Sequence, residues 1–467
     1  MNIIFLKDLI FCLLLKLVLD ERYNVILPFK KEIPDLSNIS PKKIISEKLL
    51  SNFIMSELRI GTEPQSIKLR IELTSNLFYI ASYQSISKIK FNQHNSSTYK
   101  KISNETLYPH ISKLIGGVLS SDYIYFNETN NEKYNIEFIL GLETEKDNSG
   151  GLIGLSLDDP TRKKYNNYSF IQELKKIKII KDYYFTIKYI NNFSGNLIIG
   201  DLPHKYDNKY NINNYKDIYS DIKANEIIWN IQFDKIYTVN SSNSSNIRNI
   251  DERINVYFII ELNVIEGTEN YRYDFLNTFY KENKNLCFEV LSDNYYTYYC
   301  NDKADISKLK NLNFFNKELN YTFELSYKDL FFYNEKDGNY YFLIIFKDYS
   351  EEDYPIYSWK LGEPIFKKYE IFFNKDNKKI GIYIPGDNKE KEKEKETESE
   401  TNYEEEQTWW SRNKWYVILI IILVLLFIGL SVTIFLYIKN RPRKKKANEL
   451  DDDDYEYEIT QKNNLIN

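Results

Sequence analysis

The sequence predicts a mainly β protein. Tyrosine and phenylalanine, which favour strands, occur 41 and 28 times, whereas glycine occurs only 15 times. Residues 368–373 alternate, with Tyr369, Ile371 and Phe373 on one side. A polar turn follows over residues 374–379, and a second apolar run covers residues 380–384. Strand, turn and strand in this order indicate a β-hairpin.

Length and charge restrict the possible functions. The 467 residues suffice for two or three domains. The net charge of −5 is small for this length and argues against a nucleic-acid surface. The histidines do not combine with cysteines at the spacing of a zinc site, and no nucleotide-binding loop is present. We therefore expect no metal, no other cofactor and no nucleic-acid partner.

Both ends of the chain carry membrane signals. Residues 1–20 have Lys7 ahead of a short apolar run, which indicates a signal peptide. Residues 415–437 carry no charge and, at about 1.5 Å per residue, can cross a hydrocarbon core of about 30 Å. A transmembrane helix is therefore expected over residues 414–438. Basic residues follow it, so residues 439–467 should form a cytoplasmic tail.

These signals predict a single-pass type I membrane protein, in the plasma membrane or an endomembrane vesicle. Its ectodomain would be extracellular or lumenal, on a charged stalk over residues 386–413. Residues 21–54 form an N-terminal segment without a clear element. In a secreted chain several Asn-x-Ser/Thr sequons would carry glycans. The sequons begin at Asn38, Asn95, Asn104, Asn127, Asn167, Asn192, Asn240, Asn243 and Asn320.

Two cysteines remain outside the predicted signal peptide. Cys287 and Cys300 flank a stretch that reads as strand, turn and strand, and this would bring them together. We expect one disulfide, which would stabilise the fold by about 3 kcal/mol. Two free buried thiols are the alternative.

Three stretches resemble the pepsin-like aspartic proteases. Trp359-Lys-Leu-Gly-Glu-Pro-Ile-Phe366 is similar to the Trp-x-Leu-Gly-Asp-x-Phe segment before the last hairpin of that family. Leu58-Arg-Ile-Gly-Thr-Glu-Pro-Gln65 is similar to its Ile-Gly-Thr-Pro-Pro-Gln turn, and Gly151-Leu-Ile-Gly-Leu155 to its Gly-Ile-Leu-Gly-Leu strand. The resemblance covers roughly residues 55–384. It implies a bilobal fold, with lobes over residues 55–215 and 216–385.

The resemblance also implies an Asp-Thr-Gly loop with a catalytic Asp in each lobe. Counted from the Ile-Gly-Thr turn, Glu72 takes the Asp place, Leu73 the Thr place and Thr74 the Gly place. Matching residues 75–77 to the family's Ser-Asn-Leu would instead put Ile71 at the Asp place.

In the second lobe the corresponding places fall on Glu261, Leu262 and Asn263, so both lobes show the same change. Tyr108 is either the tyrosine of the family's flap hairpin or an ordinary strand tyrosine.

Acid proteolysis needs two carboxylates that share one proton around a water. Here each carboxylate lies one methylene further out, and leucine replaces both loop hydroxyls. Thr74 would also fit poorly at a positive φ because it is β-branched. A displacement of about 1 Å can lower the rate about a hundredfold, so we expect impaired catalysis.

Three hypotheses follow. The chain is a membrane-anchored pepsin-like protein that has lost efficient proteolysis and binds a peptide or protein in its interlobe cleft. Alternatively, it is an active acid endopeptidase with a Glu72/Glu261 dyad. In the third hypothesis it is an unrelated β-rich receptor ectodomain, in which both glutamates are ordinary strand residues. A structure with Glu72 and Glu261 on distant surfaces would exclude the first two.

Overall fold

A computed structural model describes residues 24–31 and 53–384, apart from residues 111–112, 127–131, 160–164, 166–167, 206, 222–226, 241–242, 293 and 349–357. All of them belong to one compact unit, residues 1–387. The signal peptide, stalk, transmembrane helix and tail predicted for residues 1–20, 386–413, 414–438 and 439–467 lie outside the described residues. Among the helices that the structure describes, none is long and apolar enough to cross a membrane.

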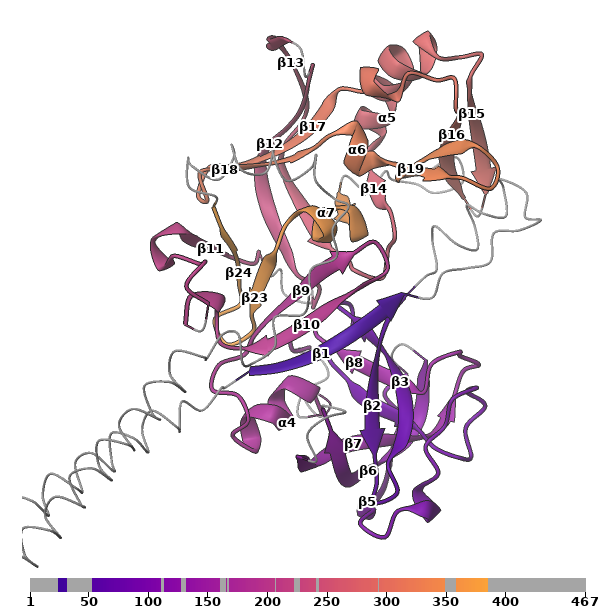
Figure 1. Ribbon diagram of the computed structural model, residues 1–467, viewed down its shortest axis with the longest axis vertical. Helices are drawn as coiled ribbons and strands as arrows, with labels where there is room; N and C mark the ends of the chain where they lie inside the picture. Colours follow the sequence, from indigo (N-terminus) through magenta and orange to yellow (C-terminus); the bar gives the residue numbers. More distant parts are fainter. Residues whose placement is uncertain are drawn as a thin grey trace, which may run out of the picture. The chain divides into compact units, whose positions relative to one another are not determined.

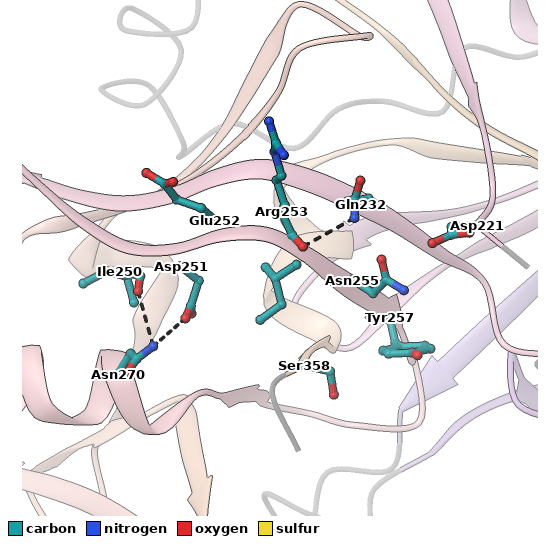
Figure 2. Close-up of a pocket in the computed structure, with 11 residues that line it drawn as sticks. Asp221, Gln232, Ile250, Asp251, Glu252, Arg253, Asn255, Tyr257, Asn270 and Ser358 are labelled. Carbon is teal, nitrogen blue, oxygen red and sulfur yellow. Dashed lines mark hydrogen bonds between the residues drawn. The ribbon is translucent and has the colours of Figure 1, made fainter. Parts of the chain in front are cut away.

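Strands dominate the described chain, so the mainly β prediction is confirmed. Within the described residues, the first sheet has the order β11-β24-β23-β9-β10-β1-β2-β3-β8-β4-β7-β6-β5. Figure 1 shows β9, β10 and β1 of this sheet side by side. Its strands are β1 (Asn24–Lys31), β2 (Ile54–Ile60), β3 (Gln65–Glu72), β4 (Phe78–Ala81), β5 (Lys100–Leu107), β6 (Leu114–Tyr125), β7 (Lys133–Thr144), β8 (Gly151–Gly154), β9 (Tyr184–Asn191), β10 (Ser194–Gly200), β11 (Tyr215–Tyr219), β23 (Ile371–Asn374) and β24 (Lys379–Tyr383).

The second sheet contains the strands between β11 and β23 in the sequence. Its order is β18-β17-β12-β13-β22-β14-β21-β16-β20-β19, and β15 pairs with β16 beside this path. The strands are β12 (Asn230–Asn240), β13 (Asn243–Phe258), β14 (Ile265–Gly267), β15 (Cys287–Ser292), β16 (Tyr295–Asn301), β17 (Asn311–Asn316), β18 (Tyr321–Leu325), β19 (Phe331–Asn334), β20 (Asn339–Phe342), β21 (Ile344–Lys347) and β22 (Trp359–Leu361).

The described helices are short. They are α4 (Phe170–Lys176), α5 (Glu269–Phe275), α6 (Tyr327–Leu330) and α7 (Glu363–Lys368), the π-helical turn η5 (Leu276–Tyr280), and the 3₁₀ turns η2 (Gln93–Asn95), η3 (Pro203–Lys205), η4 (Ile212–Asn214) and η6 (Ile306–Lys308). In α5, Tyr271 and Phe275 are buried at a spacing of four residues, which places one face of the helix against the core.

Strand β1 corrects the expectation of no clear element over residues 21–54. Val25, Leu27 and Phe29 are buried, whereas the residues between them are exposed. Their period of two is the pattern of a strand with one covered face. β1 pairs antiparallel with both β10 and β2, so it lies inside the first sheet.

The last hairpin is present, but its first strand begins later than predicted. Residues 363–368 form α7, with Pro364 in the first turn, where its missing N–H costs no hydrogen bond. β23 therefore starts at Ile371, and the alternation expected from Lys368 is wrong. All four β23 residues are buried because β24 and β9 flank the strand.

An aromatic cluster joins the last hairpin to the rest of the core. Phe373 of β23 stacks on Phe185 of β9, with ring centroids 4.9 Å apart, and lies 5.2 Å from the Trp229 ring. The Trp229 indole N–H donates to the Leu155 carbonyl at 2.9 Å. Trp229 immediately precedes β12, so this cluster connects both sheets in one hydrophobic core.

The predicted disulfide is confirmed. Cys287 of β15 and Cys300 of β16 are paired residues of an antiparallel ladder, and their sulfur atoms are bonded. Both residues are buried.

Replacing both cysteines by serine should lower the free energy of unfolding by about 3 kcal/mol, because the unfolded chain is then no longer cross-linked. Denaturant unfolding of the purified protein, compared with the Cys287→Ser/Cys300→Ser variant, measures this loss. Adding a reductant should destabilise the parent and leave the variant unchanged. A variant as stable as the parent would contradict the prediction.

Candidate active site

The same strand arrangement occurs once in each sheet. In the first sheet β3 runs parallel to β8, and β4 pairs antiparallel with β8 and parallel with β7. In the second sheet β13 runs parallel to β22, and β14 pairs antiparallel with β22 and parallel with β21. The turn 73–77 between β3 and β4 therefore corresponds to the turn 259–264 between β13 and β14.

A glycine supports each turn. A Cβ on Gly154 would lie 2.5 Å from the Ser75 carbonyl oxygen. A Cβ on Gly362 would lie 2.3 Å from the Leu262 carbonyl oxygen and 2.1 Å from that of Val264. Distances this short leave no room for a side chain. Both turns thus lie directly against a backbone that only glycine can provide.

The strand register shows which residues of the two turns occupy equivalent positions, and these differ from the pairs expected from the sequence. Glu72 pairs with Gly154. In the second sheet Phe258 pairs with Leu361, so the next step places Ile259 beside Gly362. Ile259 is therefore the counterpart of Glu72, and Glu261 is the counterpart of Thr74. The expectation that Glu72 and Glu261 hold equivalent places is wrong, because contact with Gly362 sets the register.

Thr74 binds Glu261 across the two turns. Its backbone N–H donates to Glu261 Oε1 at 2.8 Å, and its hydroxyl donates to the same oxygen at 2.5 Å. A hydroxyl therefore does bridge the turns, although leucine occupies the expected position. Thr74 also has no positive φ, so the expected conflict with its β-branch does not arise. Leu73 instead packs in the hydrophobic core.

Glu72 forms an ion pair with a buried cation. Arg70 Nη2 lies 3.1 Å from Glu72 Oε1, and Arg70 Nε lies 3.2 Å from Asp147 Oδ2. Burial disfavours the guanidinium charge, but the two carboxylates outweigh burial and raise the pKa of Arg70. The Arg70 guanidinium also stacks over the Phe53 ring, 4.8 Å from its centroid. Glu72 is thus one half of a buried, charge-compensated pair.

Glu261 is an acid with a strongly altered affinity for protons. Burial raises the pKa of Glu261 to about 7, and the negative charge of Glu72 adds to this effect. The hydrogen bonds from Thr74 oppose the shift without cancelling it. Glu261 Oε2 is buried and accepts no hydrogen bond from the described residues. The structure therefore brings Glu72 and Glu261 close enough for their charges to interact.

Tyr108 lies at the start of the turn between β5 and β6, so a hairpin exists where the flap was expected. Its side chain is 56% exposed and stacks on His110 at a centroid distance of 6.3 Å. Its contacts with His110 and Gly116 stay within the hairpin. A role at the carboxyl pair remains a prediction for Tyr108.

Sequence reasoning missed Arg70, Asp147 and the role of Thr74. One signal for Arg70 was available, because residues two apart on a strand share a face. Arg70 and Glu72 of β3 are such a pair. Asp147 is distant in the sequence, and nothing local indicates it. Among the described residues, no group of three or more histidine, cysteine, aspartate or glutamate side chains could hold a metal ion.

Known proteins give an independent comparison. The family model described as eukaryotic aspartyl protease matches residues 54–383, which is more than half of the chain. A search of curated proteins returned no relative. The match starts at β2 and ends at β24, so it includes both turns and both supporting glycines. The chain therefore belongs to the eukaryotic aspartyl protease family.

Proposed function

We propose that this family member has lost efficient proteolysis and binds a peptide or protein segment at the altered carboxyl pair. The observation that carries the proposal is the buried ion pair between Arg70 and Glu72. Two carboxylates work as an acid–base pair when they share one proton. The guanidinium 3.1 Å from Glu72 gives this carboxylate a charge partner of its own, whereas the paired acids of a protease depend on each other and on a shared proton.

The other carboxylate is also occupied. Glu261 Oε1 accepts two hydrogen bonds from Thr74, so only Oε2 remains for a ligand. The two glutamates also approach from inequivalent places of the repeated turns. Catalytic geometry that is wrong by about 1 Å can cost a factor of about a hundred in rate. Buried polar groups can nonetheless orient a bound segment, and this supports binding without turnover.

The proposal includes the setting that the sequence predicts. The binding unit would lie outside the cell or in a vesicle lumen, anchored by the helix expected over residues 414–438. A disulfide between Cys287 and Cys300 suits such an oxidising compartment.

One observation favours the second candidate, an active endopeptidase. The pKa of Glu261 rises to about 7 beside Glu72, and a proton held near neutral pH is useful in general acid catalysis. This enzyme would use Glu261 as the acid and would have to release Glu72 from Arg70. Removing one partner of a buried ion pair costs about 3–5 kcal/mol, so this release is the obstacle.

An unfolded polypeptide with a fluorophore at one end distinguishes these functions. Mixed with the purified protein between mildly acidic and neutral pH, it should show raised anisotropy from binding and no cleavage product on a gel. The Glu72→Gln and Glu261→Gln variants are assayed beside the parent. Cleavage by the parent that both variants lose would establish the endopeptidase. If the parent neither binds nor cleaves the polypeptide, both candidate functions are excluded.

Arg70→Met should lower the free energy of unfolding by about 3–5 kcal/mol at neutral pH, because it leaves the buried Glu72 and the half-buried Asp147 without their cation. Adding Glu72→Gln should recover part of this loss, since one of those charges is then removed. Denaturant unfolding of both single variants and the double variant measures the coupling.

The exposed pair Lys113–Glu145, 2.7 Å apart, provides the control. Lys113→Met should cost less than about 1 kcal/mol. Additive effects of Arg70→Met and Glu72→Gln would show that the buried pair is not energetically coupled.

Glu261 should make the folded state less stable as pH rises. Its pKa is about 7 in the folded protein, against an ordinary value of 4.5, so the folded state binds the proton more tightly. Stability should therefore fall between about pH 4.5 and pH 7, by up to about 3 kcal/mol. Glu261→Gln should lack this fall, because its amide does not ionise in the range.

Unfolding free energies at pH 4.5 and pH 8 give the comparison. Glu318→Gln, which changes an exposed glutamate in the turn between β17 and β18, is the control and should keep the parent's pH dependence. The prediction fails if Glu261→Gln keeps it too.

A further inference from the structure

Each sheet ends in a strand with a neighbour on one side only. Within the described residues, β5 is the last strand of the first sheet and β18 is the first strand of the second. An open strand edge can pair with another chain, and folded proteins protect such edges by charge, bulges or covering groups. Both strands lie beside a sequon, at Asn104 in β5 and at Asn320 just before β18.

The backbone of β5 exposes its sequon. The pairing of β5 with β6 jumps between Lys101 and Thr106, so residues 102–105 bulge out of the ladder. Asn104 lies in this bulge and is exposed. A bulge bends the strand and takes its extra residues out of the ladder between the two strands. The acceptor asparagine is therefore held away from the sheet at its open edge.

The sequon of β18 lies in a tight turn. Asn320 has φ +48°, a conformation that asparagine tolerates better than most residues, and its side chain is exposed. Its backbone N–H donates to the Lys317 carbonyl at 3.1 Å. The sequon hydroxyl belongs to Thr322, inside β18.

Part of the β18 edge is already covered from within the chain. The Tyr369 hydroxyl accepts from the Glu324 backbone N–H at 2.7 Å and donates to the Glu324 carbonyl at 2.9 Å. Alternate residues of a strand present their backbone groups to the same side. Thr322 therefore presents its groups to the same edge, next to Asn320 and beyond the reach of the Tyr369 hydroxyl.

We propose that N-linked glycans on Asn104 and Asn320 cover the open edges of β5 and β18, one in each sheet. The Asn side-chain nitrogen would form a bond to the anomeric carbon of a lipid-diphosphate-linked oligosaccharide. The lipid diphosphate leaves, and the amide loses one proton. A bulky, hydrated sugar at these positions hinders pairing of the edge with a second chain. The inference rests on the lumenal or extracellular setting of the proposed function.

The sequon hydroxyls allow a matched test. Thr106→Val and Thr322→Val remove the sequons with little change of shape, whereas Thr106→Ser and Thr322→Ser keep them. The full chain is produced in a eukaryotic secretory host and treated with a peptide N-glycosidase. Each Val variant should lose one glycan from its mass, and each Ser variant should keep it. Unglycosylated Asn104 and Asn320 in the parent would overturn the proposal.

Light scattering at constant protein concentration tests the covering role. The double Val variant should aggregate several-fold faster than the double Ser variant. Enzymatic removal of glycans from the native parent should have the same effect without any sequence change. Equal aggregation of glycosylated and deglycosylated protein would overturn the covering role. None of these readouts depends on Glu72 or Glu261, so failure here leaves the proposed loss of proteolysis intact.

Discussion

The close approach of two glycines to two turns is the constraint on which the site depends. Gly154 and Gly362 allow β8 and β22 to run directly beneath the turns 73–77 and 259–264. A side chain has no room at this contact, so the glycine must be the residue that faces the turn. This fixes how each turn is aligned with the strand that supports it. The register decides that Thr74 and Glu261 are counterparts, and that Glu72 corresponds to the apolar Ile259.

Charge compensation explains how the first turn tolerates a buried glutamate. An isolated carboxylate in an apolar interior is strongly disfavoured and either finds a cation or takes up a proton. Glu72 forms an ion pair with Arg70, and Arg70 forms a second ion pair with Asp147. Among the residues that the structure describes, no cation forms an ion pair with Glu261, and the pKa of Glu261 rises to about 7 instead. The two glutamates thus meet the same cost of burial in opposite ways, and this asymmetry distinguishes the site from two acids of equal role.

The sequence predicted the architecture better than the site. The alternation of apolar residues predicted the β fold, because such patterns reflect the covered faces of strands. The sequence motifs around Trp359 and Gly151 predicted the family. The paired cysteines followed from strand periodicity as well. β1 was missed although Val25, Leu27 and Phe29 alternate, since the mostly polar residues of this segment indicated no clear element.

The site depends on contacts that periodicity does not contain. In the run Ile259-Ile-Glu261, the sequence comparison assigned Glu261 to the position of the family's catalytic aspartate, because Glu261 is the acidic residue of this run. The true register follows from the contact of Gly362 with Leu262 and Val264, which are a hundred residues away in the sequence. Asp147, the second partner of Arg70, is also remote, 77 residues further along the chain.

The correspondence of Glu261 with Thr74 explains why the side chain at position 261 is as long as a glutamate. From the position equivalent to Thr74, the carboxylate must cross to the opposite turn to accept the two hydrogen bonds of Thr74. An aspartate there would be one methylene shorter and would leave the Thr74 N–H and hydroxyl without that acceptor, which is costly for donors that are partly shielded from water. The same extra methylene that appeared to misplace a catalytic acid therefore joins the two turns. Glu261 and Thr74 together form a polar contact between the halves of the site, so Glu261 holds the two turns together.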